Sequence, residues 1–168
     1  MIRLLGAALL VGGGTALGLC AAGRLSGRVE AIEALLEGLE LMERELAFHL
    51  AATAQLLERA ARASPPARDF FTACRTGMGQ LGEKTMADIW EEALPLAGDI
   101  GRRAQLALGA LGPVLGRYDG PGQQESLASA REELTGCLEQ ARKERMRLGR
   151  VYCALGAAAG AFVAIVLL

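Results

Sequence analysis

Two long runs of apolar residues without any charge bracket the chain. The first covers residues 4–23 and the second covers residues 151–168. A helix of either length is about 27–30 Å long, which matches the hydrocarbon core of a bilayer. The pattern predicts transmembrane helices within residues 1–23 and 151–168, with a separate helical domain over residues 24–150.

Within the polar middle, apolar residues recur at the spacing of helices. A stripe runs from Ile32 to Leu57 and predicts one long helix that ends before Pro65 and Pro66. Four further helices are predicted. They cover residues 66–78, residues 85–94 behind a capping box of Thr85 and Asp88, residues 96–115, and a stretch from about 121 into the second apolar run.

No segment of useful length alternates apolar and polar residues, so no sheet is expected. Both long helices must return to the same face of the membrane, which favours an antiparallel arrangement. The predicted fold is therefore all-α, an antiparallel helical bundle flanked by an N-terminal and a C-terminal transmembrane helix.

Charge fixes the expected orientation. The chain has a formal net charge of −1, which gives no basic surface for nucleic acid. Five basic residues stand just before the second apolar run: Arg142, Lys143, Arg145, Arg147 and Arg150. No charged residue follows that run. The positive-inside rule then places the bundle in the cytoplasm and both termini outside. A cleaved signal peptide is the alternative for the first run, although Arg24 and Arg28 directly after it oppose export.

The residues that carry chemistry are sparse. His49 is the only histidine, so a metal site or a nucleophilic triad lacks its partners. The stretch "GMGQLGEKT", residues 77–85, resembles a phosphate-binding loop, but Glu83 stands where the glycine before its Lys-Thr pair belongs. We expect no enzyme activity, no cofactor and no bound metal.

Two surfaces are candidates for contacts. Both apolar runs contain small residues at four-residue spacing: Gly14, Gly18, Gly156 and Gly160. This pattern lets membrane helices approach closely, either within one chain or between copies. One side of the first long helix is acidic and is a candidate partner face: Glu37, Glu40 and Glu43.

Glycines and a proline concentrate in "LGRYDGPGQQ", residues 115–124. Gly116 suits the end of one helix, Asp119 or Gly120 can cap the next, and Pro121 fits its first turn. The stretch predicts a helix that stops and a helix that restarts.

Four segments occur in a characteristic order: "RLSGR", "LEGLELMERE", "WEEAL" and "LGRYDGPGQQ". With the two apolar ends, they make the chain resemble the stage III sporulation protein AB family of endospore-forming bacteria. The loop pattern of that family falls on Leu115, Gly116, Asp119 and Gln123.

The resemblance implies a function that composition does not supply. The family belongs to a secretion-like complex between mother cell and forespore, and its domain is similar to the cytoplasmic domains of type II secretion inner-membrane platform proteins. It implies a non-enzymatic platform subunit in the outer forespore membrane, on the mother-cell side. Its partners would be a cytoplasmic secretion-type ATPase and the membrane and ring-forming subunits. A two-span sensor with a ligand-binding bundle, or a coiled-coil protein exported after signal cleavage, are the alternatives.

Overall fold

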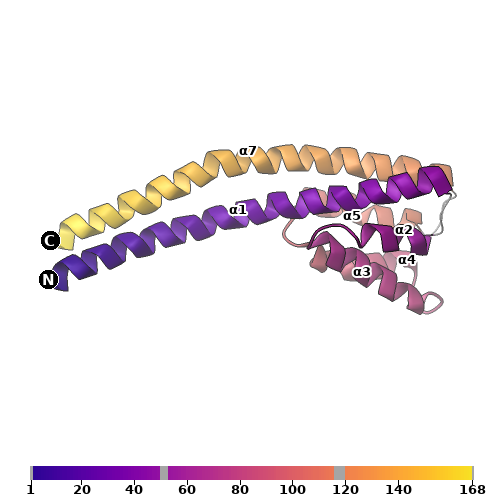
Figure 1. Ribbon diagram of the computed structural model, residues 1–168, viewed down its shortest axis with the longest axis horizontal. Helices are drawn as coiled ribbons and strands as arrows, with labels where there is room; N and C mark the ends of the chain where they lie inside the picture. Colours follow the sequence, from indigo (N-terminus) through magenta and orange to yellow (C-terminus); the bar gives the residue numbers. More distant parts are fainter. Residues whose placement is uncertain (1, 50–52, 116–119, 168) are drawn as a thin grey trace. The chain divides into compact units, whose positions relative to one another are not determined.

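Every regular element of the computed structural model is a helix within the residues it describes, which are 2–49, 53–115 and 120–167 (Figure 1). These ranges contain no β-strand, only an isolated bridge between Leu81 and Lys84. The all-α prediction is confirmed. The chain divides into a bundle unit, Arg28–Glu139, and a terminal unit, Met1–Gly27 with Gln140–Leu168.

The terminal unit consists of the first part of α1 (Ile2–His49) and the last part of α7 (Gly120–Leu167). Both predicted membrane segments are helical at their described residues. In the portion of the chain open to description, no helix has both the length and the apolarity that crossing a bilayer requires. The burial of Gly14, Gly18, Gly156 and Gly160 lies outside what the structure describes, so close packing at these glycines stays a prediction.

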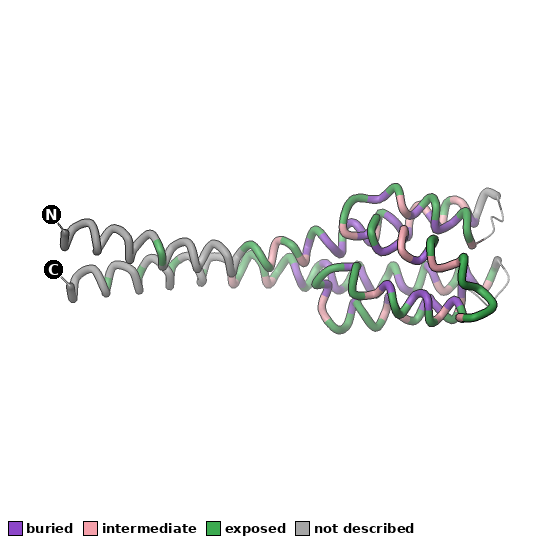
Figure 2. The backbone as a smooth tube through the Cα atoms, turned by 90° about the horizontal axis from the view of Figure 1, so that it is seen from below, coloured by how far each residue is buried: buried purple, intermediate pink, exposed green. Residues whose placement is uncertain are grey.

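Within the bundle unit, the parts of α1 and α7 that belong to it run antiparallel, side by side (Figures 1 and 2). Each buries one apolar stripe, as its helical spacing predicts. The buried residues of the two stripes are Val29, Ile32, Leu35, Leu39, Met42 and Leu46 on α1, and Leu127, Ala130, Leu134 and Leu138 on α7.

In the described ranges, five short helices follow α1 and precede α7 in the sequence. They are α2 (Thr53–Ala60), α3 (Ala67–Gly77), α4 (Met86–Ala93), α5 (Arg102–Gly109) and α6 (Leu111–Leu115). Two 3₁₀ turns, η1 (Met78–Gln80) and η2 (Leu94–Ala97), follow α3 and α4. The helices expected near residues 66–78 and 85–94 are therefore present.

The expected single helix up to Pro65 is wrong. α1 ends at His49, and α2 begins at Thr53 and runs back beside it. Arg59 Nε lies 3.3 Å from Glu45 Oε2, whereas a continuous helix would separate these residues by about 21 Å along its axis. Folding back buries the end of the apolar stripe, since Leu56 and Leu57 are fully buried.

The expected helix over residues 96–115 is also interrupted. Gly98 and Gly101 have φ angles of 82° and 79°, in the left-handed region that residues with a β-carbon rarely adopt. Between them, Asp99 Oδ2 accepts a hydrogen bond of 3.0 Å from Arg28 Nη2 of α1. These two glycines separate η2 from α5, and the chain reaches Leu115 through two short helices instead of one.

Three aromatic rings form the centre of the bundle core. Phe70 and Phe71 of α3 and Trp90 of α4 are fully buried. The Phe70 ring packs edge to face on both neighbours, with ring centroids 4.9 Å apart in each pair. Trp90 Nε1 donates a hydrogen bond of 2.8 Å to the carbonyl oxygen of Leu108, which satisfies the one polar atom of the indole.

Glycines allow two helices to approach this aromatic cluster. A methyl group at Gly38 of α1 would overlap the Phe71 ring. A methyl group at Gly112 of α6 would lie 2.8 Å from Trp90 Cβ, closer than carbon atoms pack. Any side chain at these positions would push α1 or α6 away from the core.

We expect Gly112→Ala to destabilise the protein, because overpacking a core contact costs about 1–3 kcal/mol. Gly136→Ala is the matched control. Gly136 also lies in a helix, and nothing stands within 4 Å of the added methyl, so this change should raise stability by about 0.5–1 kcal/mol. Urea unfolding of the full chain, followed by the fluorescence of the single tryptophan, measures both. Equal stability of the two variants would contradict the close approach of α6.

Candidate functional site

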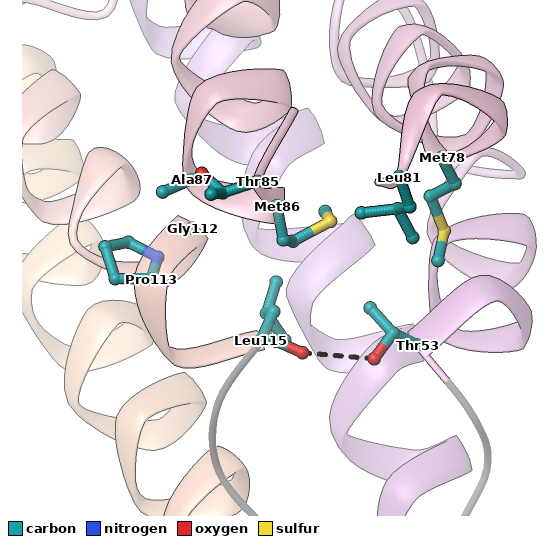
Figure 3. A pocket seen from close by; sticks show the side chains of 9 residues that line it. All are labelled: Thr53, Met78, Leu81, Thr85, Met86, Ala87, Gly112, Pro113 and Leu115. Atoms are coloured by element: carbon teal, nitrogen blue, oxygen red, sulfur yellow. Dashed lines mark hydrogen bonds between the residues drawn. The ribbon is translucent and has the colours of Figure 1, made fainter. Parts of the chain in front are cut away.

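An open groove of about 720 Å³ lies in the bundle unit (Figure 3). It sits where α2 begins and α6 ends, about 30 Å along α1 from the opposite end of the unit at Arg28. No charged side chain is among the described residues that line it. They are Thr53, Met78, Leu81, Thr85, Met86, Ala87, Gly112, Pro113 and Leu115. The described part of the groove therefore has an uncharged surface of mixed polar and apolar character.

One backbone carbonyl ties together the elements at the floor of the groove. The Leu115 oxygen accepts hydrogen bonds of 3.1 Å from Thr53 Oγ1 and 3.2 Å from Gln123 Nε2. A carbonyl at the end of a helix has no partner within that helix, so these bonds satisfy it. They join the start of α2, the end of α6 and the start of α7.

Two of the four residues of the predicted loop motif take part in this arrangement. The structure brings Leu115 and Gln123 together, and Gln123 is buried. Gly116 and Asp119 lie outside the described residues. α6 ends at Leu115 and α7 begins at Gly120, in agreement with the expected stop and restart. Thr53, the second donor, was not singled out by sequence reasoning, because nothing local marks a threonine as the partner of a carbonyl 62 residues away.

A capped helix start forms the opposite wall. The Thr85 backbone N–H donates to Asp88 Oδ2 at 2.9 Å, and the Asp88 N–H donates to Thr85 Oγ1 at 3.3 Å, so the predicted capping box is present. The Thr85 hydroxyl also donates to Asp88 Oδ2 at 2.7 Å. Together these bonds hold the pKa of Asp88 below its ordinary value, with the hydroxyl bond the larger cause. The cap fixes where α4 presents Met86 and Ala87 to the groove.

The lysine and the threonine of the glycine-rich stretch before this cap make contacts within the bundle unit. Lys84 Nζ lies 2.6 Å from both carboxylate oxygens of Glu92. Its charge is therefore engaged on α4, and Thr85 serves the cap. Among the described side chains, no group of three or more His, Cys, Asp and Glu residues is arranged to hold a metal ion.

The acidic residues predicted as a partner face have partners inside the bundle. Glu37 Oε2 accepts a hydrogen bond of 3.0 Å from the Ser64 backbone N–H. Arg131 of α7 reaches both other carboxylates, with its Nη1 3.8 Å from Glu40 Oε1 and its Nε 3.4 Å from Glu43 Oε2. These carboxylates therefore connect α1 with α7 and with the segment before α3.

An ion pair also connects α5 with α7. Arg103 Nε donates to Glu133 Oε1 at 2.6 Å, and this contact raises the pKa of Arg103 and lowers that of Glu133. Both side chains are largely exposed, so the pair contributes little free energy and serves mainly to orient α5.

One protein family matches the chain over nearly its whole length. The family model described as stage III sporulation protein AB matches residues 3–168. Neither a curated protein nor a solved structure matches. The match includes both apolar ends, the bundle and the loop motif, and it confirms the resemblance seen in the sequence. The chain belongs to the stage III sporulation protein AB family, which implies a role in the third stage of sporulation.

Proposed function

We propose that the chain is a non-enzymatic platform subunit of a sporulation-specific, secretion-like complex between mother cell and forespore. In this role it docks a cytoplasmic secretion-type ATPase to the membrane and to the ring-forming subunits. The observation that carries the proposal is the family match over residues 3–168. Fold and family alone do not specify a partner, so the mechanism rests on the surfaces described above.

In this proposal the terminal unit is the membrane anchor in the outer forespore membrane, with the bundle in the mother-cell cytoplasm and both termini outside. The two uncharged runs and the basic residues before residue 151 support this orientation. The side chain of Phe162 is 69% exposed in the terminal unit. Large apolar side chains exposed on such a helix suit contact with lipid acyl chains.

The groove is the proposed docking site for an apolar segment of the ATPase. The residues described in its lining are uncharged, and Leu81 at its edge is 48% exposed. Its two threonine hydroxyls already form intramolecular bonds, Thr53 with Leu115 and Thr85 with Asp88.

The acidic face is the second candidate for docking. Half of the Glu40 side chain is exposed, although it faces Arg44 and Arg131. Because Arg131 already neutralises part of this face, a basic partner would have to compete with an existing ion pair.

Leu81→Glu should reduce co-purification of the ATPase about tenfold or more, because it places a charge at the edge of an apolar contact. Leu106→Glu is the matched control, since Leu106 is 67% exposed on α5 and does not line the groove. Pull-down from sporulating cells compares the two variants, with the urea midpoint as a check on folding. Equal recovery of the ATPase by both variants would argue against docking at the groove.

Replacing Arg131 and Glu43 tests the acidic face. Glu43→Gln and Arg131→Gln should each lower the free energy of unfolding, and the double variant should reveal a coupling of about 0.5–1 kcal/mol. ATPase recovery should not change in either single variant. Docking through the acidic face predicts a different result, in which Glu43→Gln weakens recovery and Arg131→Gln, which releases the carboxylates, does not.

Topology is testable with Arg68→Cys, an exposed position on α3. A membrane-impermeant maleimide should label this residue only after protoplasts are lysed. The unmodified chain sets the background. Burial raises the pKa of the Cys74 thiol to about 12 and also raises that of Cys137, so both stay protonated and shielded at neutral pH. Labelling in intact protoplasts would place the bundle outside and would favour the sensor or the exported protein.

A further inference from the structure

Basic residues crowd α7 immediately before its uncharged end. Five of the nine residues from Arg142 to Arg150 are Arg or Lys, and Glu144 is the only carboxylate among them. Arg24 stands at the corresponding boundary of α1, directly after the first uncharged run, and is exposed. We call Arg24, Arg142, Lys143, Arg145 and Arg147 the basic collar; all belong to the terminal unit.

Most residues of this segment are exposed, and its two half-buried residues, Glu144 and Leu148, lie on one side of the helix. From Arg142 to Leu148, about two turns of helix, no residue is buried. Arg145, Met146 and Arg147 are exposed at consecutive positions, which lie about 100° apart around the axis. The exposed residues therefore cover a broad arc of the helix, which a layer of lipid headgroups can contact throughout.

The polarity of the exposed side chains along α7 also changes as it would across a membrane surface. Met146 is 63% exposed among the cations, and beyond Arg150 the exposed side chains are apolar. Long basic side chains place their methylene groups against apolar surroundings and extend their charges to the phosphate level. The sequence of charged, mixed and apolar exposed residues matches the passage from headgroups to acyl chains.

We propose that the basic collar binds the headgroups of anionic phospholipids. Guanidinium groups pair with phosphate through two parallel hydrogen bonds, which suits phosphatidylglycerol and cardiolipin alike. Each cation near an anionic bilayer surface strengthens association about fivefold at low salt. The proposal rests on the membrane insertion given under the proposed function and adds the class of lipid that the protein selects.

The test uses the full chain in mixed phosphatidylcholine and phosphatidylglycerol vesicles. Spin-labelled versions of each lipid report how much of it is motionally restricted by the protein. We expect the protein to restrict phosphatidylglycerol in preference to phosphatidylcholine, with a preference that weakens as salt is added. In Arg145→Gln/Arg147→Gln the preference should fall about fivefold for each cation removed.

Arg68→Gln/Arg75→Gln is the matched control, because it removes two exposed arginines from α3 in the bundle unit. Its preference should equal that of the unmodified chain. Equal restriction of both lipids by the unmodified chain, or an equal loss in the two double variants, would overturn lipid selection while leaving membrane insertion intact. Absence of any restricted lipid would overturn insertion and lipid selection together. A different result would overturn lipid binding by the basic collar in favour of protein binding. In that case Arg145→Gln/Arg147→Gln would keep the lipid preference, and an acidic subunit would be lost from the complex purified with this variant.

Discussion

The buried indole of Trp90 is the contact on which the rest of the bundle depends. Its ring packs against Phe70, and its N–H is satisfied by the Leu108 carbonyl, so α4 is fixed relative to both α3 and α5. Gly112, which lies against the same indole, also lines the groove, as does Met86 one turn before Trp90 on α4. The shape of the proposed docking site is therefore set by the core behind it. Aromatic packing of this kind is geometrically specific, which explains why a helix as short as α6 has a defined position.

The described residues of the family loop motif have a structural role. Leu115 and Gln123 do not present a reactive group; they meet at a carbonyl that Thr53 also contacts. A buried carbonyl without partners would cost free energy, and two donors from different helices remove that cost while locking the helices together. The motif consequently joins the helices at one end of the bundle beneath the groove, and in the proposed function the groove provides the surface for binding.

Several charged residues of the bundle unit form contacts within it. Arg131 spans the two long helices, Arg28 holds the loop between Gly98 and Gly101, and Lys84 is bound to Glu92. The two units differ in the chemistry of their surfaces. The bundle unit offers an uncharged groove, and the terminal unit offers cations beside an uncharged run. In the proposed function these correspond to a protein partner and to the lipid surface, which keeps the two recognition tasks separate.

The sequence by itself determined the features that depend on neighbouring residues. Helical spacing, the Thr85 and Asp88 cap, the start of α7 near Pro121, the uncharged ends and the family motif can all be read locally. Only the tertiary structure decided where α1 stops, that Gly98 and Gly101 adopt positive φ, which face Gly112 presents to Trp90, and that the acidic residues of α1 meet Arg131. An apolar stripe has the same period in a straight helix and in one that folds back, so periodicity cannot distinguish them. The groove likewise arises from segments far apart in the chain, and its uncharged lining carries no signature in any one of them.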